Sequence, residues 1–272
     1  MSMSKSAPDA HIASLMESTF GACRFARWNS GSYHDSHHAM YVAEVLAAMA
    51  TRRRHDPERR LFLTQVALLH DADPRPSDVP TPASVRRTLD WMEKRRKVLQ
   101  WRLSWTDEAY FTARALIART DFPFSNIPRD DETTMSGASP YEIYRHCMLE
   151  LDPDSRDRTF EDAQLLRFAD QCANYCRDFE TASASVDALS LEMEQTDRPM
   201  NRWELNTPAF IKDLAGDSMW DTRLKRQLGL GGRVFGQAEL MLFFLPPDLQ
   251  KNLERNRRLF QRERELRLVT TG

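Results

Sequence analysis

Apolar residues along this chain recur at steps of three and four positions, which is the spacing of one face of an α-helix. They do not alternate with polar residues, as they would in half-buried β-strands. Long stretches are rich in Ala, Leu, Arg, Glu and Gln, which favour helix, and only nine glycines interrupt the 272 residues. The pattern therefore predicts an all-α protein.

Polar or proline-rich segments separate the predicted helices. The segment 71–82 contains four prolines, which forbid a helix and predict an ordered surface loop. The segment 229–233 is rich in glycine but lacks the Lys-Ser/Thr that ends a phosphate-binding loop. A helix capped by Asp35 or Ser36 runs to about residue 53, and the other helices are predicted over residues 9–28, 57–70, 83–100, 106–120, 140–149, 160–177 and 247–268.

Two units are predicted along the chain. Residues 1–195 contain the most regular helical pattern and are expected to form the core domain, a helical bundle. Residues 196–272 begin irregularly and end in a helix dense in Arg and Glu, so we expect a mainly helical extension. Mixed charges on that last helix favour a solvated or oligomer-forming helix over a nucleic-acid arm. A homo-oligomer is one possible state of the protein.

Composition places the chain among ordinary soluble proteins. Hydrophobic residues make up 41% and charged residues 29%, and no run of about 18 apolar residues predicts a membrane helix. The formal net charge of -2 gives no basic field, which argues against a nucleic-acid partner. Four cysteines do not form a disulfide scaffold, so the Cys172 and Cys176 pair is interpreted as buried core residues. We expect a cytoplasmic protein.

The basic run in the helix predicted over 83–100 has two interpretations. A solvated face is the simpler one, and a wall that faces a phosphate group is the alternative.

Histidines and aspartates at helix-core positions are the informative residues. His38 shares a helical face with Val42 and Val45, and His70 with Asp71 follows a nearly all-apolar helix end. Asp170 lies in another apolar stretch of a later helix. Burying such groups is costly unless they are paired or bind a metal ion.

A buried set of two histidines and two aspartates suits a divalent cation. Imidazole nitrogen and carboxylate oxygen are ligands for Mn, Mg, Fe, Ni, Co or Zn, and the ion's identity stays open. Such an ion can lower the pKa of a water molecule and polarise a phosphoryl group, which are the contributions that hydrolysis needs.

This ordered set resembles the H…HD…D signature of the HD superfamily of metal-dependent phosphohydrolases. His38-Ala-Met-Tyr-Val42 is similar to the family's first metal histidine, Ala67-Leu-Leu-His-Asp71 to its His-Asp helix, and Phe168-Ala-Asp170 to its last aspartate. The resemblance spans about residues 12–190. It implies an HD-domain helical bundle in which His38, His70, Asp71 and Asp170 bind the metal, and in which Asp71 also belongs to the catalytic set.

The segment Tyr33-His-Asp-Ser-His-His38 resembles the Tyr-His-Asn-x-x-His of cyclic-nucleotide phosphodiesterases and of a bacterial group of predicted HD phosphohydrolases. In the phosphodiesterases, the histidine that matches His34 is thought to protonate the leaving oxygen. A histidine suits that task because its ordinary pKa lies near neutral pH. The alternative for His34 is a turn residue that caps the following helix.

Departures from the family's pattern limit what the resemblance implies. Asp71-Ala-Asp-Pro-Arg-Pro contains no second histidine, so one metal ion is expected rather than two. Asp73 is interpreted as a turn residue before Pro74 or, alternatively, as a water-mediated ligand or general base. HD enzymes that hydrolyse nucleotide alarmones carry a Glu-Asp pair just after their His-Asp pair. That Glu-Asp pair is missing after His70-Asp71, so we do not favour an alarmone as the substrate.

Residues that surround the predicted site are candidates for binding substrate. Arg75 and Arg119 could grip a phosphate with two hydrogen bonds each, although arginines in such loops are often solvated. Asp121 follows Thr120 where many HD pockets have a polar helix end. The candidate substrate-binding residues are Tyr33, Asp73, Arg75, Arg119 and Asp121.

These observations predict a metal-dependent phosphohydrolase that acts on a phosphomonoester or phosphodiester of a small molecule, with a nucleotide favoured. The alternative is an HD-fold module that senses a ligand or binds a partner with weak catalysis. An HD-type di-iron oxygenase would need further ligands, for which the sequence offers few candidates.

Overall fold

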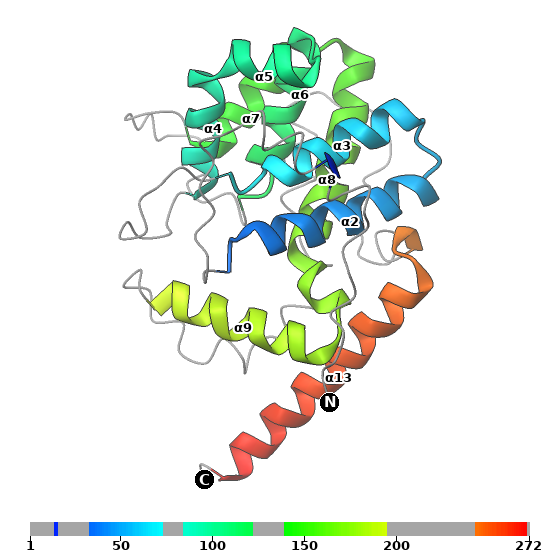
Figure 1. Cartoon of the computed structure of the whole chain (residues 1–272), viewed down its shortest axis with the longest axis vertical. Coiled ribbons are helices and arrows are strands. Elements are labelled where there is room, and N and C mark those ends of the chain that lie inside the picture. The colour runs from blue at the N-terminus through cyan, green and yellow to red at the C-terminus, as the bar shows by residue number, and fades with distance from the viewer. Residues whose placement is uncertain (1–13, 16–32, 73–83, 122–138, 195–242, 271–272) are drawn as a thin grey trace.

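The computed structural model describes residues 14–15, 33–72, 84–121, 139–194 and 243–270. All regular structure in these ranges is helical, which confirms the predicted all-α fold (Figure 1). The helices are α2 (Ser36–Arg52), α3 (Pro57–Leu69), α4 (Ser84–Lys94), α5 (Arg96–Leu103), α6 (Asp107–Ala118), α7 (Pro140–Leu149), α8 (Pro153–Cys172), the short 3-10 helix η1 (Asn174–Cys176), α9 (Phe179–Glu194) and α13 (Pro247–Thr270).

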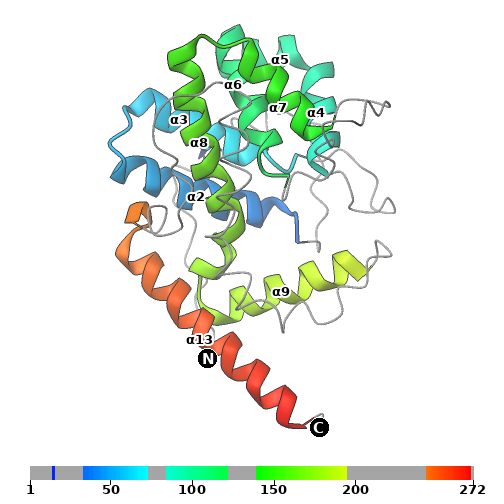
Figure 2. The ribbon, with the colours of Figure 1, turned by 180° about the vertical axis from the view of Figure 1, so that it is seen from behind.

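Helices α2, α3 and α8 form the centre of the arrangement. A four-residue connection joins α2 to α3, and α8 contacts both (Figure 2). Helices α4 to α7 lie together at one end, where α6 contacts α7 and α8. Helix α9 and helix α13 lie at the other end, and both contact η1.

Several helices begin where the sequence offers a capping oxygen. The side chains of Asp35, Asp56 and Asp152 accept hydrogen bonds from the first backbone N–H groups of α2, α3 and α8. Such caps satisfy donors that have no partner inside the helix. Proline occupies the first turn of α3, α7 and α8, where its missing N–H costs nothing. These local signals place the helix starts.

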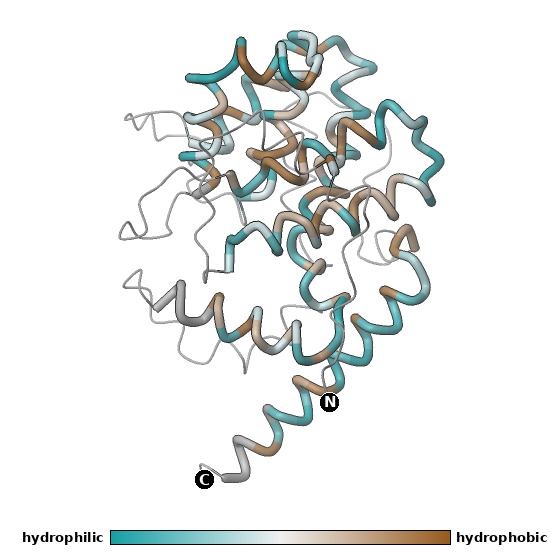
Figure 3. The backbone as a smooth tube through the Cα atoms, in the orientation of Figure 1, coloured by the Kyte–Doolittle hydropathy of each residue, from teal (hydrophilic) through white to brown (hydrophobic). Residues whose placement is uncertain are grey.

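The apolar faces of the central helices form one core (Figure 3). The run Val66–Leu69 at the end of α3 is fully buried, as its sequence predicts. On the other side, Phe260 of α13 contacts the rings of Tyr175 and Phe179. The last helix of the predicted extension therefore packs against the segment that follows α8, while the boundary at residue 195 stays a prediction.

Two predicted helices differ from the observed ones. The helix expected over 83–100 is broken at Arg95 into α4 and α5, since the backbone of Arg95 (φ -117°, ψ 14°) departs from helical values. Arg96, the first residue of α5, pairs with Asp107 at 2.6 Å. Helix α8 begins at Pro153 rather than near 160, since the Asp152 cap and Pro153 already start a helix there.

Several predictions lie outside the described residues. They concern the helix over 9–28 apart from residues 14–15, the proline-rich loop with Asp73 and Arg75, and the glycine-rich segment 229–233. In the described part of the chain, no helix combines the length and the apolar character needed to cross a membrane.

A buried ion triad joins α8 to the start of α3. The Asp162 carboxylate is fully buried and lies 3.0 Å from His55 Nε2 and 2.5 Å from Arg59 Nη2. Burial alone would raise the pKa of Asp162, but the hydrogen bond from His55 and the charge of Arg59 outweigh it and lower this pKa. The triad thus holds together two of the helices that present the candidate site.

Asp162→Asn is expected to lower the free energy of unfolding by about 3 kcal/mol at pH 7, because it leaves the partly buried guanidinium of Arg59 without its buried anionic partner. The pKa of Asp162 is lowered by folding, so its contribution is present above the unfolded pKa of about 3.9 and is lost as the pH falls below it. Urea unfolding of both proteins from pH 7 to pH 3 should show the difference shrinking. Asp107→Asn, at the exposed pair with Arg96, should change stability much less; an equal loss would contradict this account.

Candidate metal centre

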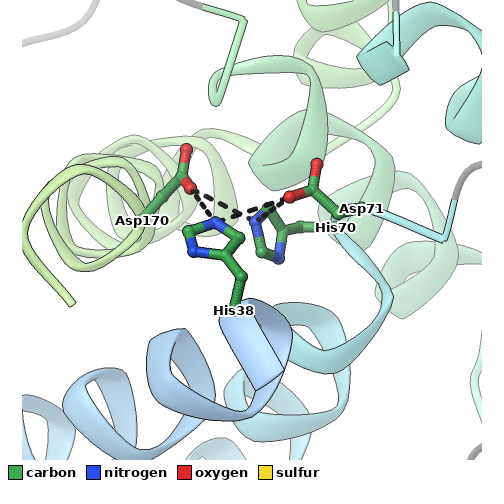
Figure 4. A group of neighbouring side chains, drawn as sticks. All are labelled: His38, His70, Asp71 and Asp170. Atoms are coloured by element: carbon green, nitrogen blue, oxygen red, sulfur yellow. Dashed lines mark hydrogen bonds and ion pairs between the residues drawn. The ribbon is translucent and has the colours of Figure 1, made fainter. Parts of the chain in front are cut away.

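Three helices bring His38, His70, Asp71 and Asp170 to one point (Figure 4). His38 lies in the first turn of α2, His70 and Asp71 directly follow α3, and Asp170 lies near the end of α8. The cap residue Asp35 accepts from the backbone N–H groups of His37 and His38, each at 2.9 Å. The helix start that carries His38 is therefore fixed locally.

The two imidazoles direct the same ring nitrogen at the two carboxylates. His38 Nε2 lies 3.0 Å from Asp170 Oδ1 and 3.5 Å from Asp71 Oδ2. His70 Nε2 lies 3.3 Å from Asp170 Oδ1 and 3.1 Å from Asp71 Oδ2. One ligand atom from each of the four residues lies within 4.8 Å of all the others. Such a spacing lets all four atoms reach a single ion.

A backbone carbonyl fixes the orientation of His70. Its Nδ1 lies 2.6 Å from the carbonyl oxygen of Ala67, which can only accept a hydrogen bond. The proton of a neutral His70 therefore stays on Nδ1, and the lone pair of Nε2 points to the carboxylates. Histidines that bind metals commonly have such an outer hydrogen bond.

Strong electrostatic coupling holds both carboxylates ionised. Burial would raise the pKa of Asp170, but hydrogen bonds from His38 and His70 outweigh it and lower this pKa to about 2. Burial likewise opposes the ionised form of Asp71, yet the nearby histidines hold its pKa well below the usual range. The carboxylates in turn raise the pKa of His70 against the effect of burial. The two carboxylates and His70 therefore stabilise one another's charged forms.

The chemistry of the donors fits a divalent cation. Asp71 Oδ2 is a buried oxygen that makes no hydrogen bond within the described residues, and it faces both Nε2 atoms. Two imidazole nitrogens and two carboxylate oxygens suit a transition-metal ion, and four ligands on a six-coordinate ion leave positions for further oxygens. The described part of the chain thus contains a cluster that could hold a metal ion, as the sequence predicts.

Asp170 is the most exposed of the four residues. The side chain of Asp170 is 18% exposed, whereas His38 and Asp71 are almost completely buried. Tyr33 and His34 are partly exposed and lie beside the cluster, with ring centroids 4.7 and 5.9 Å from that of His38. The structure thus brings both residues of the predicted Tyr-His pair to the metal centre.

The other residues that the sequence singles out are not among the four converging ligands. Arg119 and Asp121 lie at the end of α6, where the Arg119 side chain is fully buried. His37 is exposed. The cysteines Cys172 and Cys176 are buried, which agrees with their interpretation as core residues. Roles of Tyr33, Arg119 and Asp121 in binding a substrate stay predictions.

Asn174 is a site residue that the sequence analysis missed. Its amide nitrogen lies 3.2 Å from His38 Nδ1, and its side chain also hydrogen-bonds to Tyr33. Burial raises the pKa of Tyr33, and the charges of Tyr175 and Asp170 add to that effect, so the Tyr33 hydroxyl keeps its proton. Asn174 follows Asp170 by four residues inside a buried stretch, and this spacing is the signal that could have identified it.

Comparisons with known protein families, with curated proteins and with solved structures found no match for this chain.

Proposed function

We propose that this protein is a metal-dependent phosphohydrolase of the HD type. The proposed substrate is a phosphomonoester or phosphodiester of a small molecule, with a nucleotide as the favoured class. The observation that supports it most is the convergence of four ligand atoms from three helices beside His34. The family assignment rests on the order and spacing of these residues.

His38, His70, Asp71 and Asp170 would hold one divalent ion. When bound, the ion would supply a water molecule of lowered pKa and a positive charge that polarises the phosphoryl group. The four residues provide this site with two negative charges in a mostly buried position, which favours a cation over an anion. Their outer hydrogen bonds keep both imidazoles oriented.

His34 would donate a proton to the leaving oxygen of the substrate. It is partly exposed, its ring centroid lies 5.9 Å from that of His38, and it is not one of the four converging ligands. Burial raises the pKa of Asp71, and the charge of His34, after that of His70, is among the causes that lower it. In this assignment His34 carries the proton that a general acid must supply.

The test is elemental analysis of the purified full chain, followed by assays of phosphomonoesters, phosphodiesters and nucleotides with Mn, Mg, Ni, Co, Fe and Zn. We expect at least one divalent ion at about one per chain and hydrolysis that a chelator stops and the ion restores. A protein that binds its ion but hydrolyses none of these esters would contradict the proposal. That result would favour the ligand-sensing module instead.

A further inference from the structure

His38 uses both ring nitrogens, and each has a distinct neighbour. Nε2 faces the carboxylates of Asp71 and Asp170, and Nδ1 faces the side-chain amide of Asn174 at 3.2 Å. Both His38 and Asn174 are buried, with exposed fractions of 2% and 3%. A neutral histidine that binds a cation through Nε2 must carry its proton on Nδ1. The group opposite Nδ1 must then accept a hydrogen bond.

The oxygen of Asn174 can be that acceptor. In the present orientation the amide nitrogen faces Nδ1, and the buried Asn174 Oδ1 has no hydrogen-bond partner among the described residues. The two ends of an asparagine amide have nearly the same shape, so a half turn of the amide group exchanges them. After that turn, the oxygen lies opposite Nδ1 and can accept from its N–H.

The Tyr33 hydroxyl is compatible with this orientation. It hydrogen-bonds to the Asn174 side chain, and a hydroxyl can either donate or accept. When the amide oxygen of Asn174 faces it, the Tyr33 hydroxyl donates the hydrogen bond to that oxygen. Asn174 would therefore connect Tyr33 and His38, which precede and begin α2, to the segment that follows Asp170.

We propose that Asn174 is a positioning residue of the metal centre: its side-chain oxygen accepts a hydrogen bond from His38 Nδ1–H and thereby keeps Nε2 available to a divalent cation. The Ala67 carbonyl has the equivalent relation to His70. The inference rests on metal binding by the four residues and not on the proposed hydrolysis, so either can fail without the other.

Helix α13 holds the segment that carries Asn174. The side-chain amide of Asn256 donates to the carbonyl oxygens of Tyr175 and Arg177 at 2.9 and 2.8 Å. Asn252 donates to the carbonyl oxygen of Cys176 at 3.1 Å. These bonds satisfy the last carbonyls of η1 and the carbonyl of Arg177, which follows it. The last helix of the chain thus fixes the backbone from which Asn174 reaches His38.

Two replacements of Asn174 separate the proposed role from a structural one. Asn174→Leu keeps the approximate shape but removes the acceptor, and we expect it to weaken Zn²⁺ or Mn²⁺ binding by about 10- to 100-fold. Asn174→Asp keeps an acceptor opposite Nδ1, so we expect it to bind the ion at least as tightly as the wild type. Isothermal titration with the metal alone measures both affinities.

Nitrogen-15 NMR of histidine-labelled, Zn²⁺-loaded protein gives a second readout. A hydrogen-bonded His38 Nδ1–H should exchange slowly with solvent in the wild type and in Asn174→Asp, and rapidly in Asn174→Leu. The His70 Nδ1–H, bonded to Ala67, is the internal reference and should stay protected in all three. Loss of metal binding and of the His38 signal in both variants would overturn the proposal.

Asn252→Leu is the matched control. It makes the same replacement and removes one amide hydrogen bond to the same segment, but Asn252 does not bond to His38. Its affinity should equal that of the wild type. If Asn252→Leu weakens binding as much as Asn174→Leu, Asn174 acts only through the fold of η1 and the proposal is wrong. A wild-type chain that binds no divalent ion would overturn the metal centre itself.

Discussion

Asp170→Ala is expected to abolish tight binding of a divalent ion. Asp170 Oδ1 is the carboxylate oxygen closest to His38 Nε2 and also lies 3.3 Å from His70 Nε2, so it occupies the centre of the ligand set. Removing it leaves three donors and a single negative charge. Loss of an outer hydrogen bond typically costs 10- to 100-fold in metal affinity, so loss of a direct ligand should cost more than about 100-fold.

Elemental analysis after dialysis and titration with Mn²⁺ or Zn²⁺ measure this loss. Added metal should raise the melting temperature of the wild type, because the ion binds the folded chain preferentially, and should leave that of Asp170→Ala unchanged. Asp162→Asn is the matched control, since Asp162 is another buried carboxylate on α8 that lies outside the cluster. This control should be less stable yet still bind the ion. Full metal content in Asp170→Ala would refute the centre.

The capping residues made much of the fold predictable. The helix predicted over 140–149 coincides with α7, whose start is marked by the capping box of Ser139 and Glu142 and by Pro140 in the first turn. Asp56 and Pro57 mark the start of α3 in the same way. Capping residues and prolines act on the helix start beside them, so the sequence alone is enough to identify them.

The cluster that could hold a metal ion was predictable for a different reason. His38, His70 and Asp170 are polar residues on apolar helical faces, and burial without a partner would be costly for each. A sequence shows that such groups need partners, although it does not measure the distances between them. That these residues meet at one point was predicted from their order along the chain, which resembles the H…HD…D signature.

Features that depend on tertiary contacts were not predictable. The break at Arg95 accompanies the pairing of Arg96 with Asp107, which belongs to the following helix α6. The role of Asn174 depends on Tyr33 and His38, which are more than 130 residues away along the chain. The four-residue spacing from Asp170 could have drawn attention to Asn174, but its contact with His38 required the structure.

His34→Asn is expected to slow hydrolysis by about 10²- to 10⁴-fold while leaving the metal bound, because it removes a general acid and no ligand. The effect should depend on the leaving group. A nitrophenyl ester leaves as a stable anion and needs little protonation, whereas an alkyl ester needs a proton on its leaving oxygen. Turnover of the alkyl ester should therefore fall further, and steady-state rates on the two esters measure the difference.

His37→Asn is the control for His34, since His37 is the exposed neighbour whose ring bonds to Asp35 rather than facing the cluster. It should keep both metal and turnover. Loss of metal from His34→Asn would make His34 a ligand and would contradict its assignment as the proton donor. Equal slowing of both esters would also contradict that assignment, because an acid that protonates the leaving oxygen matters most where the leaving group is most basic. If His34→Asn keeps its ion and loses more turnover on the alkyl ester than on the nitrophenyl ester, His34 acts as a proton donor beside an intact metal centre.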